Sequence, residues 1–258
     1  MTKIYAVISG KGGVGKTTTT INLGTSLNYL GEDVVIVDAN LTTPNVGIHL
    51  GAPIVPVTLN HVLSNQVKFE EAIYEHESGT KVMPASLSLR ETEKVDYKKF
   101  PELMKKVKKM TGYVLIDSAA GLGEEARAAI NACDEIIIVT NPEMSAVTDA
   151  LKTIKLTEEK GKPVAGVILT RYRGKNHEMS IPNIRDMLEI PILGIIPEDD
   201  AIRESQALKN AVIHTHPRSK AAKTYFNTSK RILGEDVEFI DPKKLGLVGR
   251  FLQSIGLK

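Results

Sequence analysis

Six short runs of this sequence are apolar throughout, and stretches with turn residues and helical patterns separate them. Runs rich in Val and Ile without alternating polar residues are typical of strands buried on both faces, as in parallel sheets. We expect strands at 4–9, 33–38, 113–117, 135–140, 164–170 and 192–196, with a further candidate at 80–84. Helices are expected near 16–30, 98–110, 123–132, 145–160, 180–188 and 218–233. This alternation predicts an α/β fold with one doubly wound, mostly parallel sheet and helices on both of its faces.

The composition excludes several other classes of protein. With 33 Lys and Arg against 31 Asp and Glu among 258 residues, the formal net charge is +2, which gives no strong field for capturing nucleic acid. The single cysteine, Cys133, allows no disulfide framework and no cysteine-ligated cluster within one subunit, so we expect a packed small side chain. The N-terminal apolar run is too short for a signal peptide, and no run reaches the ~18 apolar residues that span a bilayer. These features favour a cytoplasmic protein.

The first apolar run leads into a glycine-rich loop with two lysines. The loop follows the pattern G-x-x-x-x-G-K-[ST] of nucleoside triphosphate-binding P-loops. Its residues are Gly10, Lys11, Gly12, Gly13, Val14, Gly15, Lys16, Thr17 and Thr18. Glycines let the backbone N–H groups point inward as an anion nest, and the helix expected to begin near Lys16 adds the positive end of its dipole. In such a loop Lys16 neutralises the β- and γ-phosphates and the Thr17 hydroxyl binds Mg²⁺.

A dinucleotide-binding loop is the alternative interpretation of the same glycines. Gly10, Gly12 and Gly15 also satisfy G-x-G-x-x-G, and Asp38 ends the second expected strand, where a dinucleotide fold places its ribose-binding acid. The lysine and threonine after the last glycine decide against this alternative, because a dinucleotide loop needs neither a lysine nor a magnesium ligand there. The sequence therefore predicts a site for ATP and Mg²⁺.

The second lysine of the loop, Lys11, gives the sequence K-G-G-V-G-K-T-T, which resembles the deviant Walker A motif of the ParA/MinD family of P-loop ATPases. Further segments resemble that family in their residues and in their order along the chain; these are 38–40, 116–121, 140–143, 169–172 and 196–199. The likeness extends nearly continuously over residues 1–233 and is specific to the MinD-like branch. All of these segments fall at the carboxyl ends of expected strands, where open α/β sheets bind their ligands.

The resemblance implies a role for each matching residue. Lys11 is expected to reach across a sandwich dimer to the phosphates of the partner's ATP, whereas Lys16 and Thr17 bind phosphate and Mg²⁺ within one subunit. Asp117 is expected to hold Mg²⁺ through water. The positions that line the adenine pocket in relatives are matched here by Arg171, Pro197 and Asp199.

Asn40 departs from the family pattern. Relatives usually carry an acid there, beside the γ-phosphate, where it helps to place the attacking water. Asparagine is nearly the same size and still forms hydrogen bonds with water, but it cannot take a proton. The resemblance therefore implies ATP binding with slow hydrolysis. The alternative is that Asn40 only caps a loop, because asparagine favours such positions.

The end of the chain has a basic amphipathic pattern. Its apolar residues recur at helical spacing, at Leu245, Val248, Leu252 and Ile255. Residues 241–258 carry four basic residues against one acidic residue, which suits the surface of an anionic membrane. Relatives of the MinD type carry a similar membrane-targeting helix. We expect an ATPase domain over 1–240 and a membrane-targeting helix over 241–258, with 243–258 contacting lipid; the alternative is a helix packed on the body.

The resemblance implies a MinD-like ATPase that forms a homodimer when ATP is bound and attaches to the inner face of the cell membrane. It would act in spatial positioning with a regulatory partner protein. One alternative is a ParA-like partition protein that binds DNA, but the near-neutral charge and the amphipathic tail weigh against a nucleic-acid partner. A second is a metal-cluster carrier of the related Mrp or iron-protein type, which generally uses paired cysteines that this chain lacks.

Overall fold

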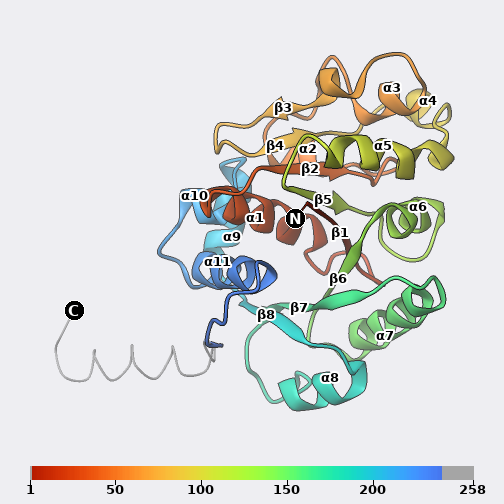
Figure 1. Ribbon diagram of the computed structural model, residues 1–258. Coiled ribbons are helices and arrows are strands. Elements are labelled where there is room, and N and C mark those ends of the chain that lie inside the picture. The colour runs from red at the N-terminus through yellow and green to blue at the C-terminus, as the bar shows by residue number, and fades with distance from the viewer. Residues whose placement is uncertain (1, 240–258) are drawn as a thin grey trace.

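A computed structural model describes residues 2–239 and shows one eight-stranded sheet in the order β3-β4-β2-β5-β1-β6-β7-β8. The strands are β1 (Lys3–Ile8), β2 (Val34–Asp38), β3 (Tyr74–Glu75), β4 (Lys81–Met83), β5 (Tyr113–Asp117), β6 (Glu135–Thr140), β7 (Val164–Tyr172) and β8 (Ile192–Pro197). All neighbouring strands are parallel except β3, which pairs antiparallel with β4 at one edge. The mostly parallel sheet expected from the sequence is confirmed (Figure 1).

Helices cover both faces of the sheet, as expected. They are α1 (Lys16–Tyr29), α2 (Val46–His49), α3 (Leu59–Leu63), α4 (Leu89–Thr92), α5 (Phe100–Lys108), α6 (Glu124–Ala132), α7 (Met144–Glu159), α8 (Ile181–Leu188), α9 (Asp200–Ala207), α10 (Val212–Thr215) and α11 (Lys220–Ile232), with short 3₁₀ turns η1 (Phe69–Ala72) and η2 (Tyr97–Lys99). Figure 1 shows α1, α9, α10 and α11 grouped on one side, and α5 to α8 follow the other side.

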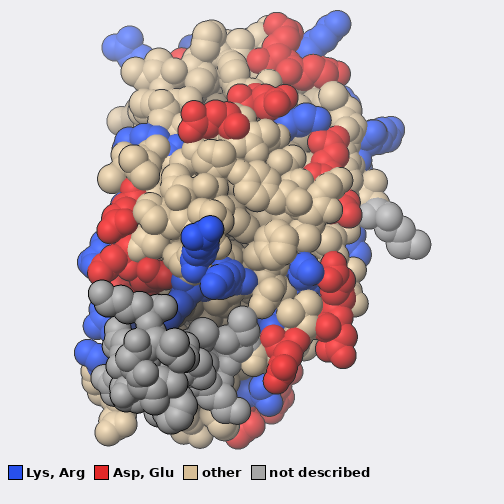
Figure 2. All heavy atoms as spheres, turned by 90° about the vertical axis from the view of Figure 1, so that its left-hand side faces the viewer, with Lys and Arg blue, Asp and Glu red and all other residues tan. Residues whose placement is uncertain are grey.

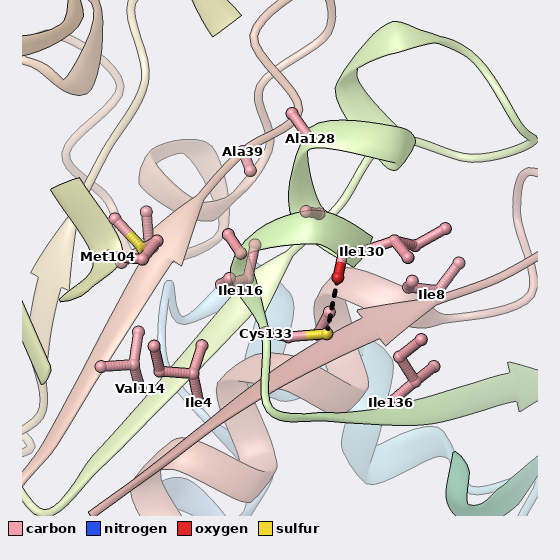
Figure 3. Packing of buried hydrophobic residues seen from close by; sticks show 14 of the residues in the cluster. Ile4, Ile8, Ala39, Met104, Val114, Ile116, Ala128, Ile130, Cys133 and Ile136 are labelled. Carbon is pink, nitrogen blue, oxygen red and sulfur yellow. Dashed lines mark hydrogen bonds between the residues drawn. The ribbon is translucent and has the colours of Figure 1, made fainter. Parts of the chain in front are cut away.

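The apolar character of β1 on both faces follows from this layering. Ile4, Ala6 and Ile8 are buried in a hydrophobic cluster with residues of α5 to α8, on one face of the sheet. Tyr5 is buried on the other face, in a cluster with residues of α1 and α11. Figure 3 shows the first cluster, in which the Cys133 thiol donates to the Ile130 carbonyl at 3.3 Å. Cys133 is buried, and burial is the main cause that raises its pKa to about 12, so the expected packed side chain is confirmed.

The segment 41–62, which is rich in Thr, Pro and Gly, is anchored to the end of β2. It contains α2 and α3, and the Asp38 carboxylate accepts hydrogen bonds from the backbone N–H groups of Asn45 and Val46 at 3.0 and 2.9 Å. Elements of two to four residues, such as β3, α4 and α10, were not predicted, because they are too short to show a period.

Arg231 of α11 fixes the segment that follows this helix. Its guanidinium donates to the backbone carbonyls of Val237 and Glu238 at 3.0 and 2.9 Å and to Leu193 of β8 at 3.0 Å. It also lies over the ring of Phe239, 3.8 Å from the centroid. One side chain therefore ties residues 237–239 to the edge of the sheet. The amphipathic pattern predicted over 241–258 lies outside the described residues.

Among residues 2–239, none of the helices is both long enough and apolar enough to cross a membrane. On the face drawn in Figure 2, acidic and basic side chains are interspersed around a mostly uncharged centre. This mixing agrees with the small net charge of the sequence.

Candidate functional site

The topology brings the phosphate loop and two carboxylates to one end of the sheet. β1 ends at Ile8 and leads into the loop, and the neighbouring strands β2 and β5 end in Asp38 and Asp117. In the parallel registers Asp117 lies opposite Val7 of β1 and opposite Asp38 of β2. The carboxyl ends of the central strands thus form the site, as expected for an open α/β sheet.

The loop has the backbone shape of an anion cradle. Gly13 and Gly15 have φ of 77° and 88°, in the left-handed region that favours glycine. Gly15 is also the N-cap of α1, so the helix begins at Lys16 with its free N–H groups facing this region. A cavity of about 390 Å³ opens over the loop, and its lining includes Gly12, Gly13, Lys16, Thr17 and Thr18.

Gly10 has a packing role. A methyl group at this position would overlap the backbone carbonyl of Asp149 in α7, so the start of the loop lies directly against that helix. Gly10 therefore fixes the loop to the body of the protein, and it does not line the cavity. This contact joins segments far apart in the sequence and could not be read from the motif.

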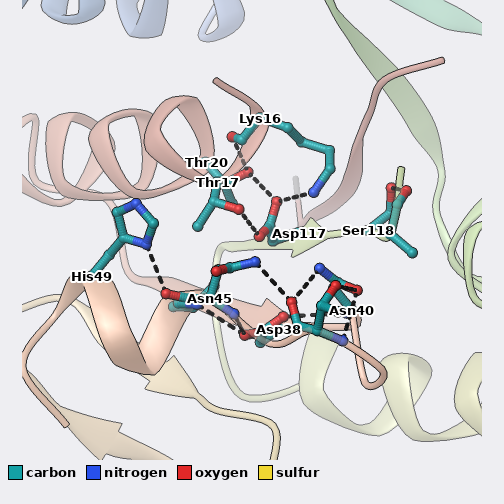
Figure 4. Close-up of polar contacts among 12 residues, drawn as sticks. Lys16, Thr17, Thr20, Asp38, Asn40, Asn45, His49, Asp117 and Ser118 are labelled. Atoms are coloured by element: carbon teal, nitrogen blue, oxygen red, sulfur yellow. Dashed lines mark hydrogen bonds and ion pairs between the residues drawn. The ribbon is translucent and has the colours of Figure 1, made fainter. Parts of the chain in front are cut away.

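The Asp117 carboxylate holds the side chains of Lys16 and Thr17 together (Figure 4). The Lys16 ammonium donates to Oδ1 at 2.9 Å, the Thr17 hydroxyl donates to Oδ2 at 2.6 Å, and the Thr20 hydroxyl donates to Oδ1 at 3.2 Å. The side chains of Lys16 and Asp117 are 8% and 0% exposed, so this ion pair is shielded from water. The three residues that the sequence assigned to phosphate and Mg²⁺ are in direct contact.

Asp38 lies beside this pair and is fully buried. Its carboxylate accepts from three backbone N–H groups, those of Asn40, Asn45 and Val46. Burial, followed by the negative charge of Asp117, raises the pKa of Asp38 to about 7, while the N–H donors and Lys16 act in the opposite direction. The two carboxylates lie side by side and repel each other, which opposes the ionisation of Asp38.

Asn40 lines the cavity, but its side chain is already engaged. The amide nitrogen donates to the Thr43 carbonyl, and the amide oxygen accepts from the Thr43 hydroxyl at 3.1 Å. Asn40 therefore closes the turn after β2, which is the loop-capping role considered from the sequence. It also faces the same cavity as Lys16 and Thr17, as the resemblance implied.

Lys11 points away from the cavity of its own chain. Its ammonium lies 3.4 Å from the Glu143 carboxylate and 3.3 Å from the Ser145 hydroxyl, at the start of α7. The side chain is 44% exposed and does not line the phosphate cavity. Lys11 is thus placed on an open surface next to the loop, where a second molecule could meet it.

The three residues matched to an adenine pocket line a second cavity, of about 210 Å³, which shares Gly15, Thr18, Arg171 and Gln206 with the first. Arg171, Pro197 and Asp199 are therefore brought together beside the loop. The Asp199 carboxylate has structural partners, because it accepts from the backbone N–H of Ala201 and of Ala221 at 3.1 and 3.0 Å. Its oxygens cap α9 and α11.

Some lining residues were not singled out from the sequence. The Ser9 hydroxyl is buried, lines the phosphate cavity and has no hydrogen-bond partner within the described part of the chain. Gln206 donates to the Thr18 hydroxyl at 2.9 Å and lies between the two cavities. Ser9 could have been identified as a lining residue, because it is a polar residue directly after a buried strand. Nothing in the local sequence indicates such a role for Gln206.

The residues present fit a triphosphate with Mg²⁺. The backbone cradle suits phosphate oxygens, Thr17 and Asp117 supply the oxygen donors that Mg²⁺ prefers, and the unpartnered Ser9 hydroxyl faces the same space. The buried ammonium of Lys16 adds the positive charge that anionic phosphate requires.

Comparison with known proteins agrees with a nucleotide-binding domain. A model of the CobQ/CobB/MinD/ParA nucleotide-binding domain matches residues 5–212. The septum site-determining protein MinD of Synechocystis is 33% identical over 248 residues, which cover 93% of this chain and 93% of that protein. MinD of Pyrococcus horikoshii complexed with Mg-ADP has a TM-score of 0.86 at 35% identity, covering 90% and 96% of the two chains. A chain of the MinC:MinD cell division complex of Aquifex aeolicus has a TM-score of 0.84 at 29% identity, covering 93% and 99%.

Proposed function

This chain belongs to the MinD/ParA family of nucleotide-binding ATPases, and on that premise we propose that it is a MinD-like ATPase that joins two copies face to face when each holds ATP and Mg²⁺. The protein would act in spatial positioning, because the ATP-bound dimer would bind at one place on the membrane and recruit another protein there. The observation that carries the proposal is the contact of Lys16 and Thr17 with Asp117 beneath a glycine cradle.

Each residue would contribute a distinct part of ATP hydrolysis. Mg²⁺, when bound, supplies positive charge to the phosphates, which is the main requirement of phosphoryl transfer. Thr17 and Asp117 would hold the metal ion, and Lys16 would neutralise the β- and γ-phosphates. The backbone N–H groups of the loop would bind phosphate oxygens. Arg171 and Pro197 would line the adenine side, at the second cavity.

Lys11 would act on the nucleotide of the other subunit. Its exposed position outside its own phosphate cavity supports this role, because its ammonium is directed to the surface next to the loop. Two copies facing each other would each add one positive charge to the partner's triphosphate. Loss of the γ-phosphate would then weaken the contact and separate the dimer.

Replacement of Asn40 with aspartate is expected to raise the ATP turnover rate about tenfold, because a carboxylate can take a proton from the attacking water and general-base catalysis contributes at least this much. The carboxylate would also repel the Thr43 carbonyl that the amide nitrogen contacts now, so a small loss of stability is expected. Steady-state phosphate release measures the rate, with Asn65→Asp, an exposed asparagine that lines neither cavity of the site, as the control. An unchanged rate would leave Asn40 with only its loop-closing role.

The segment 243–258 is proposed to attach the ATP-bound dimer to the inner face of the cell membrane. One tail should bind weakly, whereas two linked tails gain avidity of roughly 10²–10⁴. Removal of 243–258 is expected to abolish sedimentation with vesicles that contain anionic lipid in the presence of ATP, with nucleotide affinity unchanged. Equal sedimentation of the shortened chain would refute the attachment.

Sizing of the protein with ATP, with ADP and without nucleotide tests the proposal most directly. A dimer with ATP only, which is recruited to vesicles, is the expected result. An ATP-dependent shift of DNA without vesicle binding would favour the ParA-like alternative. The same samples can be used to capture the partner protein that the ATP-bound form recruits.

A further inference from the structure

Glu125 is a buried carboxylate that the proposed reaction does not use. It is the second residue of α6 and is 9% exposed. One oxygen, Oε1, accepts three hydrogen bonds: from the Thr42 N–H at 2.9 Å, from the Thr42 hydroxyl at 2.7 Å and from the Tyr97 hydroxyl at 3.0 Å. Within residues 2–239 no Lys, Arg or His forms a salt bridge with Glu125.

Glu125 joins the two loops that border the phosphate cavity. Thr42 belongs to the loop after β2, and its neighbour Thr43 holds the Asn40 side chain that lines the cavity. α6 follows the loop 118–123, which begins after Asp117. That second loop is tied to the phosphate loop, because the Gly121 N–H donates to the Ser9 carbonyl at 3.0 Å.

The three donors suit a carboxylate at this position. A buried charged acceptor with several donors forms stronger hydrogen bonds than a neutral one, so the contact with Thr42 is specific in distance and direction. Burial and then Glu125 raise the pKa of the Tyr97 hydroxyl, so Tyr97 stays a donor to this carboxylate. Thr42 is therefore held by a helix that follows, through the loop 118–123, the strand ending at Asp117, the residue that contacts Lys16 and Thr17.

We propose that Glu125 is a positioning residue that holds the loop 39–45 against α6 and so keeps Asn40 and Thr43 facing the phosphate cavity. This inference rests on the proposed function, because its effect on rate requires ATP hydrolysis. Glu125 does not line the cavity and touches none of the phosphate-loop residues. Its loss should therefore reduce kcat more than the affinity for ATP-Mg.

The test compares Glu125→Ala, Glu125→Gln and Glu124→Ala. Glu124 is exposed and next in sequence on the same helix, so its variant is the matched control. Glu125→Ala is expected to lower kcat about tenfold, the effect of losing roughly 1.4 kcal/mol of positioning, with KM for ATP-Mg within twofold of wild type. Glu125→Gln is expected to restore kcat to within threefold, because its amide oxygen still accepts from Thr42.

Hydrogen–deuterium exchange of the nucleotide-free full-length protein provides a second readout that does not depend on hydrolysis. Glu125→Ala should speed exchange in a peptide that covers 39–45, whereas Glu124→Ala should not. If wild type neither binds nor hydrolyses ATP, the proposed function fails, and the exchange data still decide the role of Glu125. The inference is overturned if Glu125→Ala matches Glu124→Ala in kcat and exchange, or if KM rises as much as kcat falls.

Discussion

Replacement of Lys16 with methionine is expected to lower the affinity for ATP-Mg by about 100-fold, because charge-assisted hydrogen bonds to phosphate contribute roughly 1.5–3 kcal/mol. The same change should also lower the free energy of unfolding of the nucleotide-free protein by about 3–5 kcal/mol. The second effect follows from the burial of Asp117, which would lose its only ammonium partner among the described residues while Asp38 lies alongside. Isothermal titration measures the first quantity and denaturant unfolding the second.

The double variant Lys16→Met with Asp117→Asn separates these two effects. It removes the unpaired carboxylate, so it should recover most of the lost stability, since the asparagine oxygen can still accept from Thr17 or Thr20, which donate to different oxygens of the carboxylate. It should not recover ATP binding. Normal ATP affinity in the single variant would mean that this cavity is not the nucleotide site.

Reversal of charge at position 11, by Lys11→Glu, is expected to abolish the ATP-dependent dimer. Each interface would lose a positive charge directed at the partner's triphosphate and gain a negative charge that repels it. ATP affinity of the single chain, measured at low protein concentration, should stay within about threefold, because Lys11 does not line its own cavity and charges screened by solvent interact weakly. Light scattering with ATP and with ADP measures the dimer.

Lys105→Glu is the control for that experiment, because Lys105 is an exposed lysine of α5 whose reversal changes the net charge equally. It should leave the dimer intact. A Lys11→Glu protein that still dimerises with ATP would rule out the face-to-face arrangement through this lysine. Loss of the dimer in both variants would indicate a general charge effect instead.

The sheet was predictable because its strands are buried on both faces. In β1 the consecutive residues Ile4, Tyr5 and Ala6 are all buried, so the strand appears in the sequence as an uninterrupted apolar run. The strand order and the pairing of β3 with β4 were not predictable, since they depend on which side each crossover packs. The four-residue helix α2 was missed for a different reason, because its start is specified by contacts with Asp38.

The site was predictable where its chemistry lies in one continuous segment. The loop and Lys16-Thr17 are adjacent in sequence, and Asp117 is marked by its place at a strand end. The sequence did not indicate contacts between distant segments, such as those of Gly10 with Asp149 of α7 and of Thr42 with Glu125. Roles that depend on those contacts had to come from the structure.

The attachment of residues 237–239 by Arg231 has a mechanical consequence. A force applied beyond Phe239 would first act on the contacts of the Arg231 guanidinium with the carbonyls of Val237 and Glu238 and with the Phe239 ring. The Arg231 side chain would transmit this force to Leu193. Force would therefore reach β8 through Leu193 and the last turn of α11 through the backbone of Arg231 itself.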